Sequence, residues 1–435
     1  MLNIGISYYT NMLADDLERF NEWWFTGKVR RELALPFRRY AFSRMMESVG
    51  KRQILIVTGA RRVGKTTLLH QTIKSLLETV DRGRILYFSF EESEVGPEEV
   101  LEFYEKKVLK RAFEETDRVF VFFDEIQYAA NWSSVLKRFY DLYPNLKFFV
   151  SGSSSLLLSK DAVERLASRF FFLKLKPLTF SEFLELKGVK RDSVESSRRR
   201  VETLFYDYLR KSGFPEIVDW ESEVRIAEYV RNSVVDRVAL RDIPRMFKTR
   251  DMALLEKIIN LILSEPGSII NVNSLSRTWG ESKITISNYL KFLESSLLIR
   301  SLSNFRPSFL SSSRKLKKYY PATPSLIFSY SKEGFEKKMA AVLETYAVNA
   351  LEADCYFREG KKEVDIILRN KELLPIEVKE SVDERDVDRF SKLVEYIGAK
   401  KGVILSLGRE MKRMKVEVIP VYMIEFLLDR AKPQA

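Results

Sequence analysis

The chain has 435 residues, of which 45% are hydrophobic, and a formal net charge of +12. This length exceeds what one hydrophobic core usually supports, so we expect two to four domains. The single cysteine, Cys355, excludes an internal disulfide. The single histidine, His70, excludes zinc sites built from His and Cys and argues against Ser-His-Asp catalysis.

The same features predict the compartment and the class of partner. The sequence has no run of eighteen apolar residues and no signal-peptide pattern, so we expect a cytoplasmic protein with no membrane span. The positive charge favours a partner with a phosphate backbone, such as DNA, although a solvated basic surface explains the same charge.

The N-terminal segment, residues 1–45, carries Trp23-Trp24 among several arginines, which suggests an amphipathic segment laid against the first domain. Residues 46–190 then alternate between strand and helix patterns. This alternation predicts an α/β domain with a parallel sheet, whose ligand lies at the carboxyl edge of the strands. The expected strands are 53–57, 85–90, 119–123, 148–151 and 170–175, and the expected helices include 97–113 and 132–140.

A glycine-rich loop from Gly59 to Thr66 joins the first expected strand to a helix and has the pattern G-x-x-x-x-G-K-[ST]. The glycines let the backbone approach a phosphate, and the loop N–H groups and the helix N-terminus would face that phosphate. Lys65 would neutralise the β- and γ-phosphates of ATP during catalysis, and the Thr66 hydroxyl would bind Mg²⁺. We assign nucleotide binding to Gly59, Ala60, Arg61, Arg62, Val63, Gly64, Lys65, Thr66 and Thr67.

Two carboxylates, Asp124 and Glu125, follow the apolar run of the third expected strand. A strand with apolar residues on both faces is typical of a parallel sheet, and its carboxyl end would bring both acids near the phosphate loop. Asp124 would complete the Mg²⁺ shell, and Glu125 would polarise the attacking water. An ordinary solvated turn is the alternative.

The strand expected at 148–151 ends in Ser151, with Ser153 close behind it. Nucleotide hydrolases with an additional strand place a residue that senses the γ-phosphate here, and we prefer Ser153 for this role. Arg169 comes just before the strand expected at 170–175. It is a candidate to reach a γ-phosphate, in cis or across a subunit interface. A surface ion pair explains this arginine equally well.

Five motifs occur in this order along the chain: Gly59–Thr67, Asp124–Gln127, Ser151–Ser154, Pro177–Phe183 and Ser212–Glu216. Together they resemble the AAA+-type archaeal and bacterial ATPases whose C-terminal part is restriction-endonuclease-like, over roughly residues 46–400. The resemblance implies a P-loop AAA+-type domain over residues 46–190 and a helical lid over residues 191–248. Ser168 and Ser212 stand where that family usually has glycine, and neither change removes a chemical group.

Residues 249–320 predict a winged helix-turn-helix, with a turn at Gly280 and a third helix capped by Ser282. Basic and polar side chains of the third helix would face outward, and a run of basic and aromatic residues follows the wing. This pattern favours DNA contact, although winged domains also serve as protein-packing modules. The DNA-binding candidates are Lys283, Asn288, Lys291, Arg314, Lys315, Lys317 and Lys318.

Residues 321–435 contain an expected strand at 363–368 and, after a turn, a second strand that carries Glu377 and Lys379. Residues two apart on a strand share one face, and Asp365 lies on the paired strand near the same patch. This spacing resembles the PD-(D/E)xK nuclease core, which implies a restriction-endonuclease-like α/β fold with Mg²⁺ and an activated water. The predicted metal ligands are Glu344, Asp365 and Glu377, and the predicted catalytic lysine is Lys379.

We therefore expect a DNA-associated ATPase whose Mg²⁺-dependent ATP hydrolysis drives or switches its activity. Its C-terminal region is a candidate nuclease. A regulatory protein with an inactive nuclease-like region, whose nucleotide state controls partner contacts, is the alternative. A small-molecule kinase is the third candidate, but it leaves the winged helix and the C-terminal acids unexplained.

Overall fold

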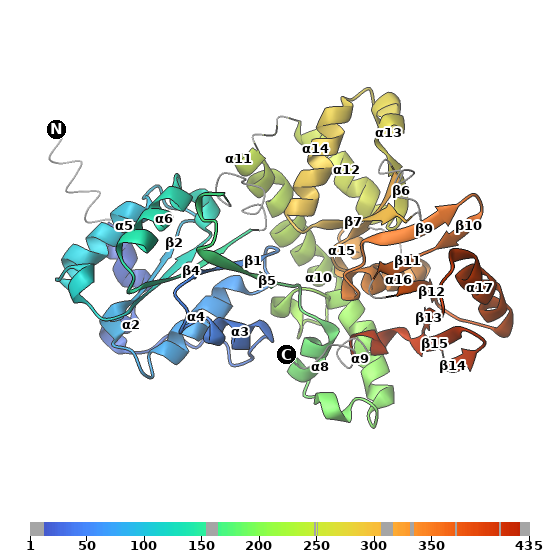
Figure 1. Cartoon of the computed structure of the whole chain (residues 1–435), viewed down its shortest axis with the longest axis horizontal. Helices are drawn as coiled ribbons and strands as arrows, with labels where there is room; N and C mark the ends of the chain where they lie inside the picture. Colours follow the sequence, from blue (N-terminus) through green and yellow to red (C-terminus); the bar gives the residue numbers. More distant parts are fainter. Residues whose placement is uncertain are drawn as a thin grey trace. The chain divides into compact units, whose positions relative to one another are not determined.

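The computed structural model describes residues 13–153, 164–247, 249, 251–305, 316–330, 335–369, 372–408 and 410–426, without the side chain of Met246. The chain forms two compact units, Met1–Lys176 and Pro177–Ala435 (Figure 1). The predicted residues Arg314 and Lys315 lie outside the described residues.

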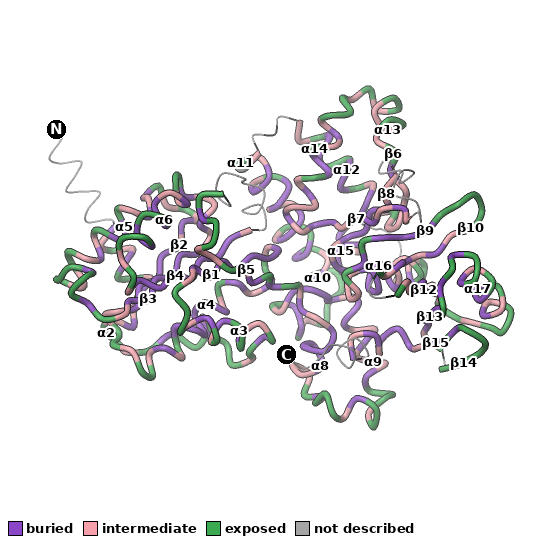
Figure 2. Tube along the Cα trace, viewed as in Figure 1, coloured by how far each residue is buried: buried purple, intermediate pink, exposed green. Residues whose placement is uncertain are grey.

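The first unit is built on a five-stranded parallel sheet with the order β2-β3-β4-β1-β5. Strands β1, β3 and β4 are buried along their whole length (Figure 2), because side chains on both faces of these inner strands are covered. The five strands predicted for this region are confirmed. They are β1 Ile54–Gly59, β2 Ile85–Ser89, β3 Val119–Asp124, β4 Leu146–Gly152 and β5 Phe170–Leu175.

The helices of this unit follow the strands in alternation, as predicted, with one difference. The single helix expected over 97–113 ends early: α5 covers Pro97–Phe103, a π-helical turn covers Tyr104–Leu109, and Lys110 adopts the left-handed conformation at φ 54°. A residue in that conformation ends a helix, so the chain turns there. The other helices include α2 Trp23–Thr26, α3 Ala41–Glu47, α4 Lys65–Leu76 and α6 Trp132–Leu142.

The N-terminal segment covers strand β2, which lies at one edge of the sheet. The Asn21 side chain accepts a hydrogen bond from the Tyr87 N–H and donates one to the Tyr87 carbonyl. Both Trp23 and Trp24 donate an indole hydrogen bond to the Ile85 carbonyl. These contacts satisfy backbone groups that an edge strand would otherwise expose, and they confirm that the segment lies against the first domain.

The second unit begins with helices. Glu425, near the C-terminus, accepts hydrogen bonds from the backbone N–H groups of Phe180 and Ser181 at the start of the first of these helices. A carboxylate at this place satisfies N–H groups that a helix start leaves without partners. The helices are α8 Phe180–Leu186, α9 Arg198–Lys211, α10 Glu223–Tyr229 and α11 Ile243–Phe247, with π-helical turns at Val230–Val235 and Val238–Asp242.

Three helices and three strands follow: α12 (Met252–Ser264), α13 (Val272–Trp279), α14 (Lys283–Ser295), β6 (Ser268–Asn271), β7 (Ile299–Asn304) and β8 (Leu316–Pro321). The three strands pair antiparallel around β8, and β7 also pairs with β9 from the region beyond residue 320. One five-stranded sheet, in the order β10-β9-β7-β8-β6, therefore joins residues 249–320 to the C-terminal region.

The C-terminal region adds a second sheet, in the order β11-β12-β13-β15-β14. The single strand expected over 363–368 is wrong, because the chain bends at Asp365. The segment before the bend pairs with β9, and the segment after it pairs with β12, so Asp365 lies where the chain passes from one sheet to the other. The elements are α15 Ser325–Phe328, α16 Met339–Ala350, β9 Cys355–Glu359, β10 Lys362–Val364, β11 Ile366–Arg369, β12 Leu373–Lys379, α17 Glu384–Ile397, β13 Gly402–Ser406, β14 Met411–Arg413 and β15 Val416–Pro420.

No helix in the described parts of the chain is both long enough and apolar enough to cross a membrane.

Candidate functional site

The phosphate-loop sequence forms a tight turn between β1 and α4. A Cβ atom on Gly59 would lie 2.6 Å from the Leu175 carbonyl oxygen, and Gly64 has φ 96°. Both positions therefore require glycine. The buried Arg39 donates hydrogen bonds to the carbonyls of Val63 and Lys176, at 2.8 and 2.9 Å. These contacts hold the loop beside the end of strand β5.

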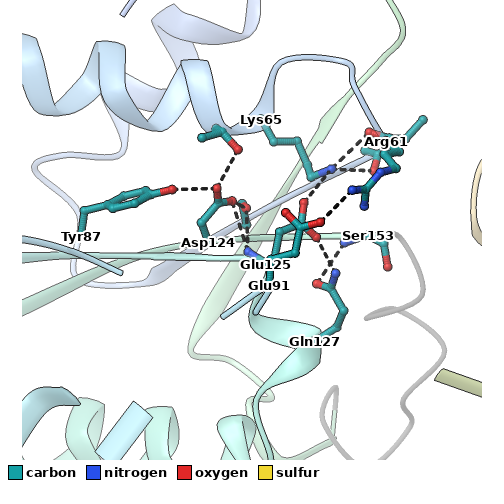
Figure 3. A network of polar contacts seen from close by, with 12 residues as sticks. Arg61, Lys65, Tyr87, Glu91, Asp124, Glu125, Gln127 and Ser153 are labelled. Atoms are coloured by element: carbon teal, nitrogen blue, oxygen red, sulfur yellow. Dashed lines mark hydrogen bonds and ion pairs between the residues drawn. The ribbon is translucent and has the colours of Figure 1, made fainter. Parts of the chain in front are cut away.

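Asp124 is the centre of a hydrogen-bond network at the carboxyl end of β3 (Figure 3). Its Oδ2 atom accepts hydrogen bonds from Thr66 at 2.6 Å and from Tyr87 at 2.9 Å. Its Oδ1 atom accepts one from Ser151. Burial and the Asp124 charge raise the pKa of Tyr87, so its hydroxyl stays protonated and keeps donating.

This arrangement fits a Mg²⁺ ion. Mg²⁺ in nucleotide sites is held by one or two protein oxygens together with phosphate oxygens and water. The Thr66 hydroxyl and the Asp124 carboxylate provide two such oxygens at the end of the phosphate loop. A third acid is not required for this kind of site.

Glu125 faces the phosphate loop from the next position. Its φ of 51° is left-handed, which turns its side chain toward Lys65, whose ammonium lies 3.5 Å from a Glu125 oxygen. The other Glu125 oxygen accepts a hydrogen bond of 2.5 Å from Gln127. The Lys65 ammonium also donates to the Gly59 and Ala60 carbonyls. The loop cation and the candidate base are therefore adjacent (Figure 3).

The two serines after β4 lie in different contacts. Ser151 is fully buried and bonds to Asp124. The Ser153 backbone N–H donates to the Gln127 side chain at 3.3 Å. The preferred sensor, Ser153, thus lies beside the Glu125–Gln127 pair, whereas Ser151 belongs to the Asp124 network.

Arg169 lies at the amino ends of the strands, whereas the phosphate loop lies at their carboxyl ends. Its carbonyl accepts a hydrogen bond from the Ile54 N–H at the amino end of β1. Five residues of strand, roughly 16 Å, separate Ile54 from Gly59. The prediction that Arg169 reaches a γ-phosphate bound by its own chain is therefore wrong. The guanidinium makes a two-pronged ion pair with Asp141, at 2.7 and 3.1 Å, as the ion-pair alternative predicted.

Three residues of the site were missed by sequence reasoning. Tyr87 bonds to Asp124, Gln127 links Glu125 to Ser153, and Glu91 forms a 2.7 Å ion pair with Arg61 of the phosphate loop. Gln127 belongs to a recognised motif, and position 91 closely follows a predicted strand, so both carried a signal. Tyr87 carried none, because a tyrosine inside a β-strand is ordinary.

Comparison with known proteins bears on this site. Residues 51–184 match the family model described as an AAA domain. Residues 202–333 match a model described as a domain of unknown function. The first match spans β1 to β5 and every residue of the site described above except Arg39, and it supports an AAA+-type P-loop ATPase domain.

Three similar proteins are each described as uncharacterized. One, from Methanocaldococcus jannaschii, is 28% identical over 361 residues and covers 79% of each chain. A second from the same organism is 26% identical over 406 residues, which are 83% of this chain and 82% of the relative. A protein from Haemophilus influenzae is 27% identical over 251 residues, 56% of this chain and 61% of the relative.

Solved structures give weak likenesses. The ORC1 protein of Aeropyrum pernix in complex with DNA is 16% identical, with a TM-score of 0.34 over 71% of this chain and 98% of that chain. AMPPCP-bound DnaA from Aquifex aeolicus is 15% identical, with a TM-score of 0.26 over 58% of this chain and 85% of that chain. Scores this low carry no weight for fold or function.

The predicted DNA-binding residues fall into two groups. On α14, Lys283, Asn288 and Lys291 are exposed, as expected for an outward face. Ile284, beside Lys283, is 73% exposed. The prediction that Lys318 on β8 binds DNA is wrong, because its side chain is buried.

Lys318 lies within a group of acids from the C-terminal region. Its ammonium is 2.7 Å from Glu363, 3.4 Å from Glu344 and 3.9 Å from Asp365. Burial lowers the pKa of Lys318, but the three carboxylates more than offset it and the pKa is raised. Lys317, the preceding residue, faces the other way, toward Ser301.

The metal ligands predicted in the C-terminal region, Glu344, Asp365 and Glu377, do not form a metal site in this arrangement. In the described portion of the chain, no group of three or more His, Cys, Asp or Glu side chains is placed to hold a metal ion. Asp365 accepts a hydrogen bond from the Val378 N–H and lies near Lys318, and Lys379 pairs with Glu377 at 3.7 Å. Burial raises the pKa of both Asp365 and Glu377.

Proposed function

We propose that the first unit binds ATP with Mg²⁺ and hydrolyses it. The observation that carries this proposal is the juxtaposition, at the phosphate loop, of the Thr66–Asp124 hydrogen bond and the Lys65–Glu125 pair. Bound Mg²⁺ would neutralise charge on the phosphates, with Thr66 and Asp124 as its protein ligands.

The chain's own residues supply the remaining chemistry. The N–H groups of the loop bind the phosphates, and Lys65 neutralises charge on the β- and γ-phosphates. Glu125 accepts a proton from the attacking water, and Gln127 holds its carboxylate in place. Ser153 is the proposed γ-phosphate sensor. Arg169 acts only across an interface with a second copy, after it exchanges Asp141 for phosphate.

We propose that this ATPase serves a DNA-associated activity, through a winged helix formed by α12–α14 and β6–β8. In support, α14 carries exposed Lys283, Asn288 and Lys291 on one surface, and the protein has a net charge of +12. Exposed lysines bind phosphate backbones by releasing counterions.

A second candidate is a nucleotide-controlled regulatory protein whose C-terminal nuclease-like region does not cleave DNA. It is favoured by Lys318, which lies among the acids that a nuclease would use for metal. If the C-terminal region is instead an active nuclease, Asp365, Glu377 and Glu344 would hold Mg²⁺. Lys379 would then orient the attacking water.

ATP hydrolysis measured without DNA and with single-stranded, double-stranded and branched DNA tests the proposal. We expect turnover that Lys65→Ala abolishes, and stimulation by at least one form of DNA. Turnover that survives in Lys65→Ala would refute the site. Turnover that no DNA changes would favour the regulatory protein.

A supercoiled-plasmid nicking assay with Mg²⁺ or Mn²⁺ separates the two roles of the C-terminal region. Nicking that Asp365→Ala, Glu377→Ala and Lys379→Ala each abolish would establish the nuclease. Absence of nicking would favour the second candidate and would leave the ATPase proposal untouched.

A further inference from the structure

We infer that the Lys318 ammonium takes the place of a metal ion among Glu344, Glu363 and Asp365, and that these three acids bind strand β8 rather than a divalent metal. In this assignment Glu344, Glu363 and Asp365 form an ion-paired junction. The junction joins the strand that follows the predicted wing to the nuclease-like region.

The periodicity of β8 explains how Lys318 reaches the acids. Successive side chains of a strand point to opposite faces, so Lys318 and Tyr320 share one face and Lys317 lies on the other. Both inward residues meet the same acceptor, because the Tyr320 hydroxyl donates to Glu344 at 2.6 Å and the Lys318 ammonium lies 3.4 Å from the same oxygen. Strand β8 thus presents two donors to one helix acid of α16.

Burial makes this pairing strong. The Lys318 side chain is only 6% exposed, whereas that of Lys317 is 34% exposed. An ammonium taken out of water is tolerated only when carboxylates surround it. Glu344 on α16, Glu363 on β10 and Asp365 at the bend after β10 provide three carboxylates.

The same positions disfavour a metal. Oxygen ligands of Mg²⁺ and Ca²⁺ lie about 2.0 to 2.6 Å from the ion, so several carboxylates must converge on one point. The described acids do not converge in this way. The Lys318 ammonium lies between them, and its positive charge would repel a divalent cation placed beside it. A metal ion could bind these acids only after Lys318 had moved away from them.

This inference does not depend on the ATPase proposal, because the phosphate loop belongs to the other unit. It goes beyond the second candidate function by naming the residue that makes the acids unavailable to metal. It also gives the acids a different role, which is to attach the strand after the wing.

A double-mutant cycle tests the junction in the full-length protein. Lys318→Met and Glu363→Gln would be combined, and unfolding by urea would be measured in the presence of a chelator. We expect the two changes to be coupled by at least about fivefold in the unfolding equilibrium constant, because they share one ion pair. Lys317→Met is the matched control, and its coupling to Glu363→Gln should be close to none. Equal coupling for both lysines would overturn the inference.

Uptake of Mn²⁺ provides a second test that does not require Lys318→Met to fold. Equilibrium dialysis of the nucleotide-free protein would compare the unmodified chain with Asp365→Asn, and with Asp124→Asn to account for the phosphate-loop site. We expect Asp365→Asn to leave Mn²⁺ uptake unchanged. Loss of one bound Mn²⁺ per chain in Asp365→Asn would overturn the inference, while ATP hydrolysis in the same variant would remain unaffected.

Discussion

The Thr66 hydroxyl donates a hydrogen bond of 2.6 Å to the Asp124 carboxylate, across 58 positions of sequence. Thr66 is the second residue of helix α4 after the phosphate loop, and Asp124 ends the strand β3. Parallel strands bring both groups to one edge of the sheet, where two oxygens can serve one Mg²⁺ ion.

Replacement of Glu125 by Gln should preserve nucleotide binding and slow hydrolysis by about 100-fold or more, because the amide cannot take a proton from water. Binding by a fluorescent ATP analogue and release of phosphate would be measured together. Glu92→Gln removes an exposed carboxylate that follows Glu91 in the sequence and should leave turnover unchanged. Equal turnover in Glu125→Gln and the unmodified chain would contradict the role of Glu125.

Tyr87→Phe should raise the Mg²⁺ concentration needed for half-maximal ATP hydrolysis by a few fold. The change removes one hydrogen bond that orients Asp124, and such a bond is worth about 1 kcal/mol. Tyr104→Phe is the matched control, because Tyr104 is a buried tyrosine of the same unit whose hydroxyl bonds to Gly83 instead. An identical Mg²⁺ dependence for both variants would show that Tyr87 is not a positioning residue.

The double change Lys283→Ala and Lys291→Ala should weaken DNA binding across unrelated sequences. It should also reduce the slope of log affinity against log salt by up to about 2, one unit for each lost phosphate contact. Fluorescence anisotropy at several salt concentrations measures both quantities. Lys337→Ala removes an exposed lysine from another element and should change neither. No difference between the variants would remove α14 from the DNA surface.

Lys147 should make stability depend on pH between about 7 and 10.5. It is buried on β4, donates to the Gln53 carbonyl, and burial together with the neighbouring Arg118 lowers its pKa to about 7. Above pH 10.5 the lysine is neutral in both states. As the pH falls toward 7 the unfolded chain binds a proton that the folded chain does not, so stability decreases, by at most about 4 kcal/mol.

The variant Lys147→Met should lose this dependence and therefore gain most relative to the unmodified chain at pH 7. Urea unfolding of the first unit at pH 7, 8, 9 and 10 checks it. Lys51→Met, at an exposed lysine near Lys147, should leave the dependence in place. Parallel stability curves for Lys147→Met and the unmodified chain would show that Lys147 is charged in the folded state.

Much of the first unit was predictable because its signals are local. The glycines at 59 and 64 and the acids at 124 and 125 each occupy a contiguous motif next to an apolar strand. In a parallel sheet every strand end with this pattern arrives at the same edge. The five strands and the meeting of Thr66 with Asp124 followed from that rule.

Which partner each side chain meets was decided by tertiary structure. Alternation along β8 predicts that Lys317 and Lys318 face opposite ways, but it does not say which of them is buried. The bend at Asp365 and the pairing of β7 with β9 bring three acids around Lys318. These contacts join residues far apart in sequence, and no local pattern encodes them.

The sequence by itself therefore determined the phosphate loop, the acids beside it and the parallel order of strand and helix, because each depends on short-range geometry. The tertiary structure decided that Arg169 lies at the far edge of its sheet, that Tyr87 supports Asp124 and that Lys318 is buried among acids. The physical reason is that desolvation and charge pairing depend on which elements pack together, and packing is set by the whole chain.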